Sequence, residues 1–579
     1  MVATIDWIVL ASTLLLIIGI GIWKSRGQRD LKGYFLGGNT MSWYKVMFSV
    51  MATQASAITF LSAPGQAFTD GMRFVQYYFG LPLAIILVTS VLVPAYHKLK
   101  VITAYEFLEK RFDVRVRVFT ALLFLMQRGL AAGLTIYAPA LVMSALLGWN
   151  IYITCAIMGI LVVIYTLSGG AKAVAYTQLQ QMLVILTGMF IAGWMVFKLL
   201  KPELSFADTL QIAGKANKLN VIVTDFNFSD KYNIWSGLLG GFFLALSYFG
   251  TDQSQVGRYL SAKSIKHSSS GLLMNAIVKI PMQFGILFIG VALYVFYIFN
   301  PQPVIFNKSL EERIKQTDYA AQYEQTEGAF RDLNTQQAHI ATQLLQAQTQ
   351  GPGGASVTLF SDQLKEVDSA MNVLRKEAKN IIEEGIPGAD TNDTNYIFLY
   401  FVLHHLPIGF IGLLLAVIFS ASWSSTSSEL NALSGTLVVD FYKRLFKPSE
   451  TDKHYVYVSR IATAFWGLLA IVFAFLATQL DSLIEAVNLL GSLFYGTILG
   501  VFVAAFLGKN WQASAVFWAA LITEISVILI YMFADVGFLW LNPLGCFMVV
   551  GLAFVFHFLL PNKPQGNVPE QKADTSTKY

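Results

Sequence analysis

The sequence predicts an all-α membrane protein with about 13 transmembrane helices, and two observations carry this prediction. Of its 579 residues, 55% are apolar and only 13% are charged, whereas soluble chains average about 25% charged residues. About thirteen apolar stretches approach or exceed the roughly 20 residues that a helix needs to cross a bilayer core. A chain with so few charges cannot cover a water-facing surface, which excludes a soluble enzyme, a disordered protein and a nucleic-acid binder.

The predicted spans follow one another along the chain with short loops between most of them. They cover residues 5–23, 45–68, 75–96, 119–147, 150–167, 174–199, 234–255, 271–299, 396–425, 457–478, 484–507, 512–533 and 540–561. No basic segment precedes the first stretch, and Lys24 and Arg26 follow it directly. These features predict an uncleaved first helix rather than a signal peptide.

Lysines and arginines gather in alternate short loops, which marks those loops as cytoplasmic. The basic loops lie near residues 24–32, 98–117, 258–266 and 443–460. With an odd number of helices, this pattern predicts an N-terminus outside and a C-terminus in the cytoplasm. The sequence therefore predicts a multi-pass protein of the plasma membrane, which in a bacterium is the inner membrane.

Residues 300–395 interrupt the apolar pattern with a polar segment rich in Gln, Glu and Ala. Two helix-like pieces, about 307–349 and 359–385, flank a Gly-Pro-Gly-Gly turn at 351–354. This arrangement predicts an extracellular helical hairpin. A solvated spacer and a lid or partner-docking element are both compatible with its composition.

Two of the spans carry many small and hydroxyl residues at membrane depth. Residues 49–65 of the second span end in a Pro-Gly pair, and seven residues between 420 and 428 of the ninth bear hydroxyl groups. A hard monovalent cation prefers several oxygen ligands, which hydroxyls and unwound carbonyls can supply. Close helix packing, with hydroxyls bonded to their own helix, is the alternative explanation.

Five short motifs follow one another along the chain in a specific order and spacing. They are Gly33-Tyr34-Phe35-Leu36-Gly37-Gly38, Thr103 to Phe112, Ser168-Gly169-Gly170 with Ala173 to Gln178, Gly250-Thr251-Asp252-Gln253 through Arg258, and Leu430-Asn431 with Val439 to Lys443. Together they resemble the sodium/solute symporter family, which includes the sodium/glucose cotransporters, the sodium/iodide symporter and bacterial sialic acid and proline symporters. The resemblance covers about residues 5–560, apart from the polar insert.

The resemblance implies a leucine-transporter-type fold, a five-plus-five inverted repeat with one leading and two trailing helices. The core helices that start near residues 45 and 234 are then discontinuous. The implied organisation is a leading helix and cytoplasmic loop (1–40), a first repeat (41–200), a second repeat (234–507) interrupted by the insert (300–395), trailing helices (508–561) and a cytoplasmic tail (562–579).

The same resemblance implies one site for a sodium ion, which would be the coupling ion. Its expected ligands are five neutral oxygens, from the carbonyls of Ala52, Ala55 and Ala421 and the hydroxyls of Ser424 and Ser425. Some relatives bind a second sodium through an aspartate, and Gln178 stands at that position here. The sequence therefore predicts a single sodium.

The residues that the family uses for the solute are only partly kept. The candidate substrate residues are Ser56, Thr59, Tyr78, Arg128 and Lys279, and the family's inner gate corresponds to Tyr248. Arg128 lies one helical turn before the position of the arginine in sialic acid transporters. Arg128 and Lys279 have no evident intramembrane acid to match them, which favours a carboxylate or another anion as solute. Snorkelling of Arg128 to the headgroups and a structural role for Lys279 remain alternatives.

The predicted function is a sodium-coupled secondary active symporter that imports a small organic solute by alternating access, with one sodium per solute. A sodium/sugar symporter with a different site, or an ion channel or facilitator, is the alternative. No nucleophile–base pair, phosphate loop or metal motif predicts an enzyme. The expected partners are a small-molecule solute and membrane lipid, without nucleic acid or an obligatory protein partner.

Overall fold

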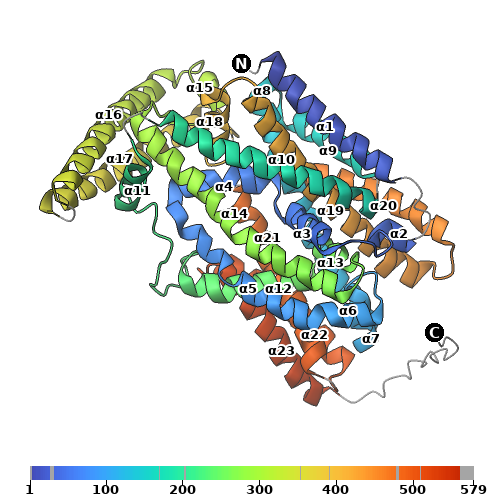
Figure 1. The fold of residues 1–579 in the computed structure, drawn as a ribbon. Helices are drawn as coiled ribbons and strands as arrows, with labels where there is room; N and C mark the ends of the chain where they lie inside the picture. Colours follow the sequence, from blue (N-terminus) through green and yellow to red (C-terminus); the bar gives the residue numbers. More distant parts are fainter. Residues whose placement is uncertain are drawn as a thin grey trace.

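A computed structural model describes residues 3–25, 31–167, 170–200, 204–351, 354–389, 391–477, 482–508 and 510–560. These residues form helices and, within the described ranges, no strand, apart from one isolated bridge between Met41 and Ala262. Figure 1 shows long helices packed side by side, with a two-helix hairpin extending away from the bundle. The predicted tail and the first two residues of the Ser-Gly-Gly motif lie outside the described residues.

The first half of the chain contains the leading helix and the helices of the predicted first repeat. They are α1 (Thr4–Ser25), α2 (Leu31–Leu36), α3 (Trp43–Gln54), α4 (Ala57–Asp70), η1 (Gly71–Tyr78), α5 (Leu81–Leu87), η2 (Val88–Leu92), α6 (Val93–Leu99), α7 (Tyr105–Arg111), α8 (Val114–Leu147), α9 (Ile151–Leu167), α10 (Gly170–Leu199) and α11 (Phe206–Lys215).

The second half contains the remaining membrane helices and the polar insert. They are η3 (Ser236–Gly240), α12 (Gly241–Thr251), α13 (Gln253–Leu260), α14 (Ile265–Phe299), α15 (Lys308–Ile314), α16 (Ala320–Gln350), α17 (Ala355–Gly385), α18 (Ile397–His405), α19 (Phe410–Thr436), η4 (Leu437–Phe446), α20 (Asp452–Leu476), α21 (Leu483–Leu507), α22 (Ala513–Phe533), η6 (Phe538–Trp540) and α23 (Leu541–Leu559).

Each predicted span falls on one of these helices or on a run of consecutive ones. Within the described ranges, nine helices are long and apolar enough to cross a membrane, and shorter apolar helices cover Thr4–Ile17, Ile151–Leu167 and Ser236–Thr251. In its apolar window, Phe410–Phe446 is 89% buried, against 33% for α22. The helix with the hydroxyl cluster therefore lies at the centre of the bundle, and α22 lies at its periphery.

Two core helices are interrupted, as the resemblance implies. The first break separates α3 from α4, where Ala55 has φ −86° and ψ 77° and Ser56 is extended. The second separates α12 from α13 at Asp252, with φ −76° and ψ 118°. Asp252 caps the following helix by accepting a hydrogen bond from the backbone N–H of Ser254 at 2.8 Å. Such breaks free backbone groups from helical hydrogen bonds, so inside a membrane they occur where the chain lines a cavity.

The prediction of one continuous ninth span over 396–425 is wrong. The structure divides this region into α18 and α19, which leave Leu406–Gly409 between them. Pro407 lacks a backbone donor, and Gly409 has a φ of +91°, which suits glycine. Asp6 of α1 then caps α19, because its Oδ1 accepts from the N–H groups of Gly409 (2.7 Å) and Gly412 (2.9 Å). The hydroxyl cluster consequently lies in the middle of a helix rather than at its end.

Two of the sequence motifs meet through charged side chains on the side of the bundle that carries basic loops. The Arg117 guanidinium, at the start of α8, contacts Asp440 of η4 at 2.7 Å and Glu109 of α7 at 2.6 Å. Arg444 contacts the same Glu109 at 2.6 Å. These residues hold the ends of α7, α8 and η4 together.

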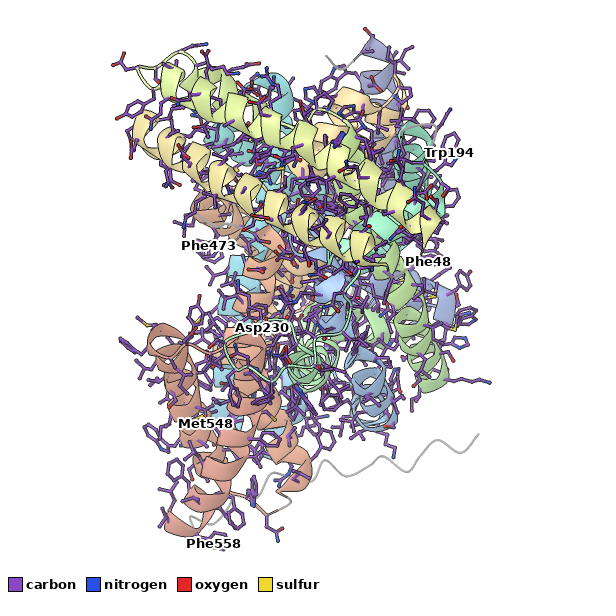
Figure 2. The ribbon with its side chains drawn as sticks, turned by 90° about the vertical axis from the view of Figure 1, so that its left-hand side faces the viewer. Phe48, Trp194, Asp230, Phe473, Met548 and Phe558 are labelled. Atoms are coloured by element: carbon purple, nitrogen blue, oxygen red, sulfur yellow. The ribbon has the colours of Figure 1, made fainter. Side chains whose placement is uncertain are left out.

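The insert folds as the predicted hairpin, with α16 packed against α17. It is attached to the C-terminal part of α14, where the Tyr294 hydroxyl donates to Asp368 Oδ2 (2.6 Å) and Asn334 Nδ2 donates to the Tyr297 carbonyl (2.9 Å). Gln337 Nε2 donates to the second oxygen of Asp368 at 2.5 Å. Figure 2 shows the hairpin crossing one end of the bundle, while Trp194 and Phe558 lie at the lateral surface. Their side chains are 51% and 71% exposed, as expected where lipid would cover them.

Candidate functional site

A cavity of about 90 Å³ lies beside the break between α3 and α4. Residues of α3, α4, η1, α8, α12, α14, α19 and α21 line it. All five candidate substrate residues and the candidate gate line this one cavity, namely Ser56, Thr59, Tyr78, Arg128, Lys279 and Tyr248. Residues that are widely separated in sequence therefore converge as expected for a binding site between helices.

Lys279 reaches the cavity from the middle of α14, two residues before Pro281. Its side chain is 1% exposed. No residue in the described ranges forms an ion pair or a hydrogen bond with its ammonium group. A buried ammonium group without a partner is costly, so Lys279 provides a strong attraction for an anion that enters the cavity.

Arg128 differs from Lys279, and the expectation that it lacks an intramembrane acid is wrong. Its guanidinium contacts Asp252 at the second helix break and lies 3.1 Å from Oε1 of Glu429 in α19. Both carboxylates are buried, with exposures of 1% and 3%. The guanidinium also donates to the hydroxyl of Tyr495. Arg128 therefore does not snorkel to the headgroups, and its charge is already balanced inside the protein.

Each carboxylate of this cluster has further donors. Asp252 Oδ2 accepts from the Tyr495 hydroxyl at 2.7 Å, and its Oδ1 accepts from the Ser254 hydroxyl at 2.6 Å. Glu429 Oε2 accepts from the Thr135 hydroxyl at 3.0 Å. Such satisfaction is what allows ionised groups to remain buried.

Tyr248 lines the cavity beside this cluster. Its ring lines the cavity, and the Arg128 guanidinium lies 5.4 Å from the ring centroid. Its hydroxyl accepts from Gln255 Nε2 in α13 at 2.5 Å. Tyr248 is therefore fixed to α12 and α13, on the side of the cavity that leads to the basic loops.

The five expected sodium ligands belong to two elements that the fold brings into contact. The Ser424 hydroxyl donates to the carbonyls of Ala52 (2.8 Å) and Ala421 (2.9 Å), and the Ser425 hydroxyl donates to Ala421 at 3.0 Å. The Ala55 carbonyl, at the helix break, accepts no hydrogen bond from the described part of the chain. All five residues are at most 1% exposed. The arrangement thus offers oxygens next to an interrupted helix, away from bulk water.

Gln178 occupies a polar cluster next to these residues. Its Nε2 donates to the hydroxyls of Thr53 (3.1 Å) and Ser428 (2.6 Å) and to the Ser424 carbonyl (3.2 Å). Its Oε1 accepts from the Ser49 hydroxyl at 2.5 Å. The three acceptors around Nε2 are oxygens of the kind that bind a cation, and here an amide donor satisfies them.

The opposite end of the cavity faces the insert side of the molecule, where polar contacts join α4 to α21. The Ser482 hydroxyl donates to Gln66 Oε1 at 3.1 Å, and Gln66 Nε2 lies 3.3 Å from Glu485 Oε1. Lys231 pairs with the other oxygen of Glu485 at 2.8 Å. Glu485, in the first turn of α21, thus links this helix to α4 and to the segment that carries Lys231.

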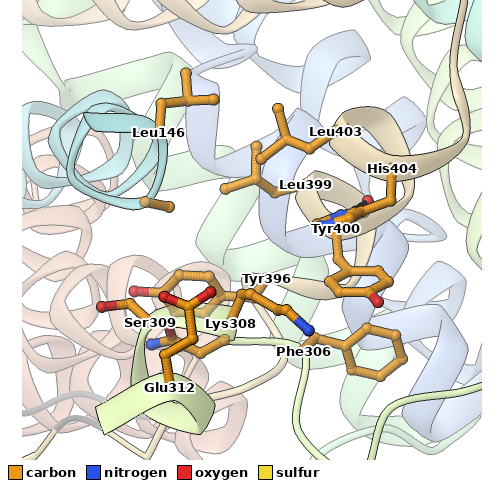
Figure 3. Close-up of a pocket in the computed structure, with 12 residues that line it drawn as sticks. Leu146, Phe306, Lys308, Ser309, Glu312, Tyr396, Leu399, Tyr400, Leu403 and His404 are labelled. Carbon is orange, nitrogen blue, oxygen red and sulfur yellow. Dashed lines mark hydrogen bonds between the residues drawn. The ribbon is translucent and has the colours of Figure 1, made fainter. Parts of the chain in front are cut away.

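A second cavity of about 310 Å³ lies at the base of the insert (Figure 3). Lys308 and Glu312 line one side of it, and Leu399 and His404 of α18 line another. None of the candidate substrate or sodium residues borders it.

Sequence reasoning missed Glu429, Asp252 and Tyr495 as members of the site. Asp252 was visible as a carboxylate inside the predicted span 234–255, which is a signal of function in membrane proteins, whereas Glu429 lies just beyond the predicted span 396–425. Glu429 directly follows the hydroxyl cluster, and Asp252 lies within a recognised motif. Tyr495 gave no comparable signal, because an aromatic residue in an apolar helix is common.

Comparison with known proteins places these features in context. A family model described as the sodium:solute symporter family matches residues 34–322 and 374–523. The chain is 26% identical over 555 residues to the sodium/sialic acid symporter SiaT of Proteus mirabilis, covering 94% of this chain and 93% of that protein. It is 25% identical over 502 residues to sodium-coupled monocarboxylate transporter 1 of Mus musculus, covering 86% and 68%.

Among solved structures, the chain resembles a sodium-coupled sialic acid symporter in a substrate-bound, outward-open state. The TM-score is 0.74 at 23% sequence identity, and the similarity covers 96% of this chain and 98% of that one. This likeness confirms the predicted fold class, an all-α membrane protein of the leucine-transporter type.

Proposed function

Because the chain belongs to the sodium:solute symporter family and sodium is its coupling ion, we propose that it imports a small organic anion, with one carboxylate, together with one sodium ion. The single observation that carries this proposal is Lys279, a buried cation that lines the cavity without a partner in the described structure. Tyr78 and the hydroxyls of Ser56 and Thr59 line the same cavity and supply hydrogen bonds to the rest of the solute.

The charges around the cavity support this stoichiometry. In their ordinary ionised forms, Arg128 and Lys279 balance Asp252 and Glu429, so the unloaded site is neutral. Adding one sodium and one monovalent anion keeps it neutral, whereas either one alone leaves a net charge in a region of low dielectric constant. Electrostatics thus favours joint binding, which is what coupled transport requires.

The size of the cavity favours a small solute. Its volume of about 90 Å³ lies below the roughly 300–1,000 Å³ of pockets that hold drug-sized ligands. Two of the named relatives are described as transporters of sialic acid and of monocarboxylates, and both solutes carry a carboxylate. The volume favours a monocarboxylate-sized solute over a nine-carbon sugar acid.

Potential dependence tests the proposed pairing of one sodium with one anion. A potential of 100 mV adds about 2.3 kcal/mol per net charge moved, and a sodium–anion pair moves none. In proteoliposomes with a fixed sodium gradient, we expect a valinomycin-imposed potential to change carboxylate uptake little. Strong acceleration by an inside-negative potential, with a flux ratio of one sodium per solute, would instead indicate a neutral solute.

We propose that the sodium ion binds to the carbonyls of Ala52, Ala55 and Ala421 and the hydroxyls of Ser424 and Ser425. Replacing Ser424 or Ser425 with alanine removes one ligand, and should raise the sodium concentration for half-maximal uptake roughly tenfold, the scale of one hydrogen bond to a charged group. Ser427→Ala is the matched control, because Ser427 is equally buried on the same helix and is not a proposed ligand. An unchanged sodium requirement in both Ser424 and Ser425 variants would contradict this site.

The proposed organisation follows the predicted repeats, with residues 41–200 inverted as 234–507, in a plasma or bacterial inner membrane. No obligatory protein partner is part of the proposal, and lipid surrounds the bundle.

The insert is proposed to lie outside the cell and the basic loops inside. A cysteine at exposed Thr335 of the insert should then react with an impermeant reagent in intact cells, and one at exposed Lys453 only after permeabilisation. The native Cys155 and Cys546 are buried, so they give little background. The reverse pattern would overturn the orientation.

A further inference from the structure

The cluster around Arg128 joins a pair of packed helices to a helix that is interrupted at one of the cluster's carboxylates. Arg128 and Glu429 belong to α8 and α19, which pack directly against each other. Asp252 belongs to the break between α12 and α13; α12 packs on α5 and α21, whereas α13 packs on α19 and α3. The Arg128–Glu429 pair therefore lies within one pair of packed helices, whereas the Arg128–Asp252 pair crosses to a discontinuous helix.

The position of the crossing pair relates it to the path out of the cavity. Arg128, Glu429 and Tyr248 line the cavity, whereas Asp252 lies one turn beyond Tyr248, towards α13. The chain after α13 carries Lys263 and Lys266 of a basic loop. The Arg128–Asp252 contact thus closes the cavity on the side of the basic loops.

Having two carboxylates for one guanidinium gives this contact an unusual property. A buried ion pair is normally hard to break, because each partner is left uncompensated in a medium of low dielectric constant. Here Arg128 keeps Glu429 when Asp252 moves away. Asp252 in turn keeps the hydroxyls of Tyr495 and Ser254 and the backbone N–H of Ser254. The contact can therefore open without leaving a bare charge.

We propose that the Arg128–Asp252 ion pair is the latch of the inner gate, which breaks when the cavity opens to the cytoplasm, and that Glu429 is the resident counter-ion that makes the opening reversible. Tyr248, fixed to α13 through Gln255, moves with Asp252 and uncovers the exit. This proposal rests on the proposed transport function, and it assigns to Glu429 and Asp252 opposite effects on the same arginine.

The test removes each carboxylate in turn and measures access from the cytoplasmic side. The reporter is Val487→Cys, which lines the cavity, in a background without Cys155 and Cys546. Inside-out vesicles are treated with an impermeant maleimide, without solute. Asp252→Asn should raise the labelling rate roughly tenfold, because losing one partner of a buried charge pair exceeds that factor in an equilibrium constant. Glu429→Gln should lower it, because Arg128 then depends on Asp252 alone.

A merely structural cluster would respond differently, because losing either carboxylate would loosen the same packing and raise labelling in both variants. Equal changes, or no change in either, would overturn the latch. Tyr495→Phe removes the hydroxyl that holds both Arg128 and Asp252 without altering a charge, and should raise labelling more weakly than Asp252→Asn. If Asp252→Asn does not fold, as judged by gel filtration, Tyr495→Phe takes its place in the comparison with Glu429→Gln. Because the labelling assay contains no solute, its outcome does not depend on whether transport is electroneutral. A failed labelling test would likewise leave the potential dependence of uptake unaffected.

Discussion

Replacing Lys279 with glutamine is expected to abolish the binding of anionic solutes while sparing the binding of sodium. Among the described residues that line the cavity, Lys279 is the only cation without a direct ion-pair partner, so it is the one that can pair with a carboxylate there. Removing one partner of a buried charge pair weakens binding by a factor of roughly 100 or more. Thermal stabilisation by a panel of monocarboxylates, measured in sodium buffer, reports the loss.

Two further measurements separate charge from packing at Lys279. Glutamine can still hydrogen-bond, so the variant should tolerate the uncharged amides of the same acids better than the acids themselves. Lys266→Gln makes the same change at an exposed position of the same helix, and should leave binding intact. If Lys279→Gln binds carboxylates as tightly as the unmodified protein does, the solute is not held as an anion at this residue.

Replacing Gln178 with aspartate is expected to create a second sodium site. The amide nitrogen of Gln178 is surrounded by the hydroxyls of Thr53 and Ser428 and the carbonyl of Ser424. An aspartate removes this donor, is one carbon shorter, and supplies an anionic oxygen, so that a cation can occupy the place of the amide. The dependence of uptake on sodium should then become sigmoidal, with a Hill coefficient that rises from about one towards two.

The same variant should change the electrical character of transport. Two sodium ions with one monovalent anion carry a net positive charge, so an inside-negative potential should now accelerate uptake. Gln178→Asn is the matched control, because it shortens the side chain equally without adding a charge. A Gln178→Asp protein that remains electroneutral, with a hyperbolic response to sodium, would show that the glutamine is not what limits the protein to one ion.

Hydropathy and motif order were sufficient to predict the fold class, because each membrane helix must satisfy its own backbone hydrogen bonds and therefore appears as a continuous apolar run. The apolar run at 396–425 led to the wrong prediction of one continuous helix, since hydropathy does not depend on backbone conformation. Only Pro407 and Gly409 marked the interruption, and Asp6, some 400 residues away, stabilises the new helix start. Boundaries that depend on a distant cap are not encoded locally.

The candidate site was predictable to the extent that single residues determine it. The positions taken from the family resemblance, Ser56, Thr59, Tyr78 and Lys279, all line one cavity, because a shared fold fixes where these positions lie, and their binding of the solute stays a prediction. The partners of Arg128 were not predictable from spacing. Asp252 and Glu429 lie more than 100 residues from it in sequence, and the pairing arises only when α8, α19 and the α12–α13 break meet. Charge balance inside a membrane is thus a property of the tertiary fold.

The attachment of the insert to α14 makes the hairpin a lever that amplifies movements of this helix. Each helix of the hairpin has 31 residues, and is therefore about 46 Å long. Because α16 contacts α14 and Tyr294 is bonded to Asp368, a tilt of α14 is carried into the hairpin. A rotation of about 10° at the base would displace the tip by roughly 8 Å over that length. A pair of spin labels, one near residue 350 and one on a helix at the opposite edge of the bundle, would thus magnify motions that are too small to resolve at the cavity itself.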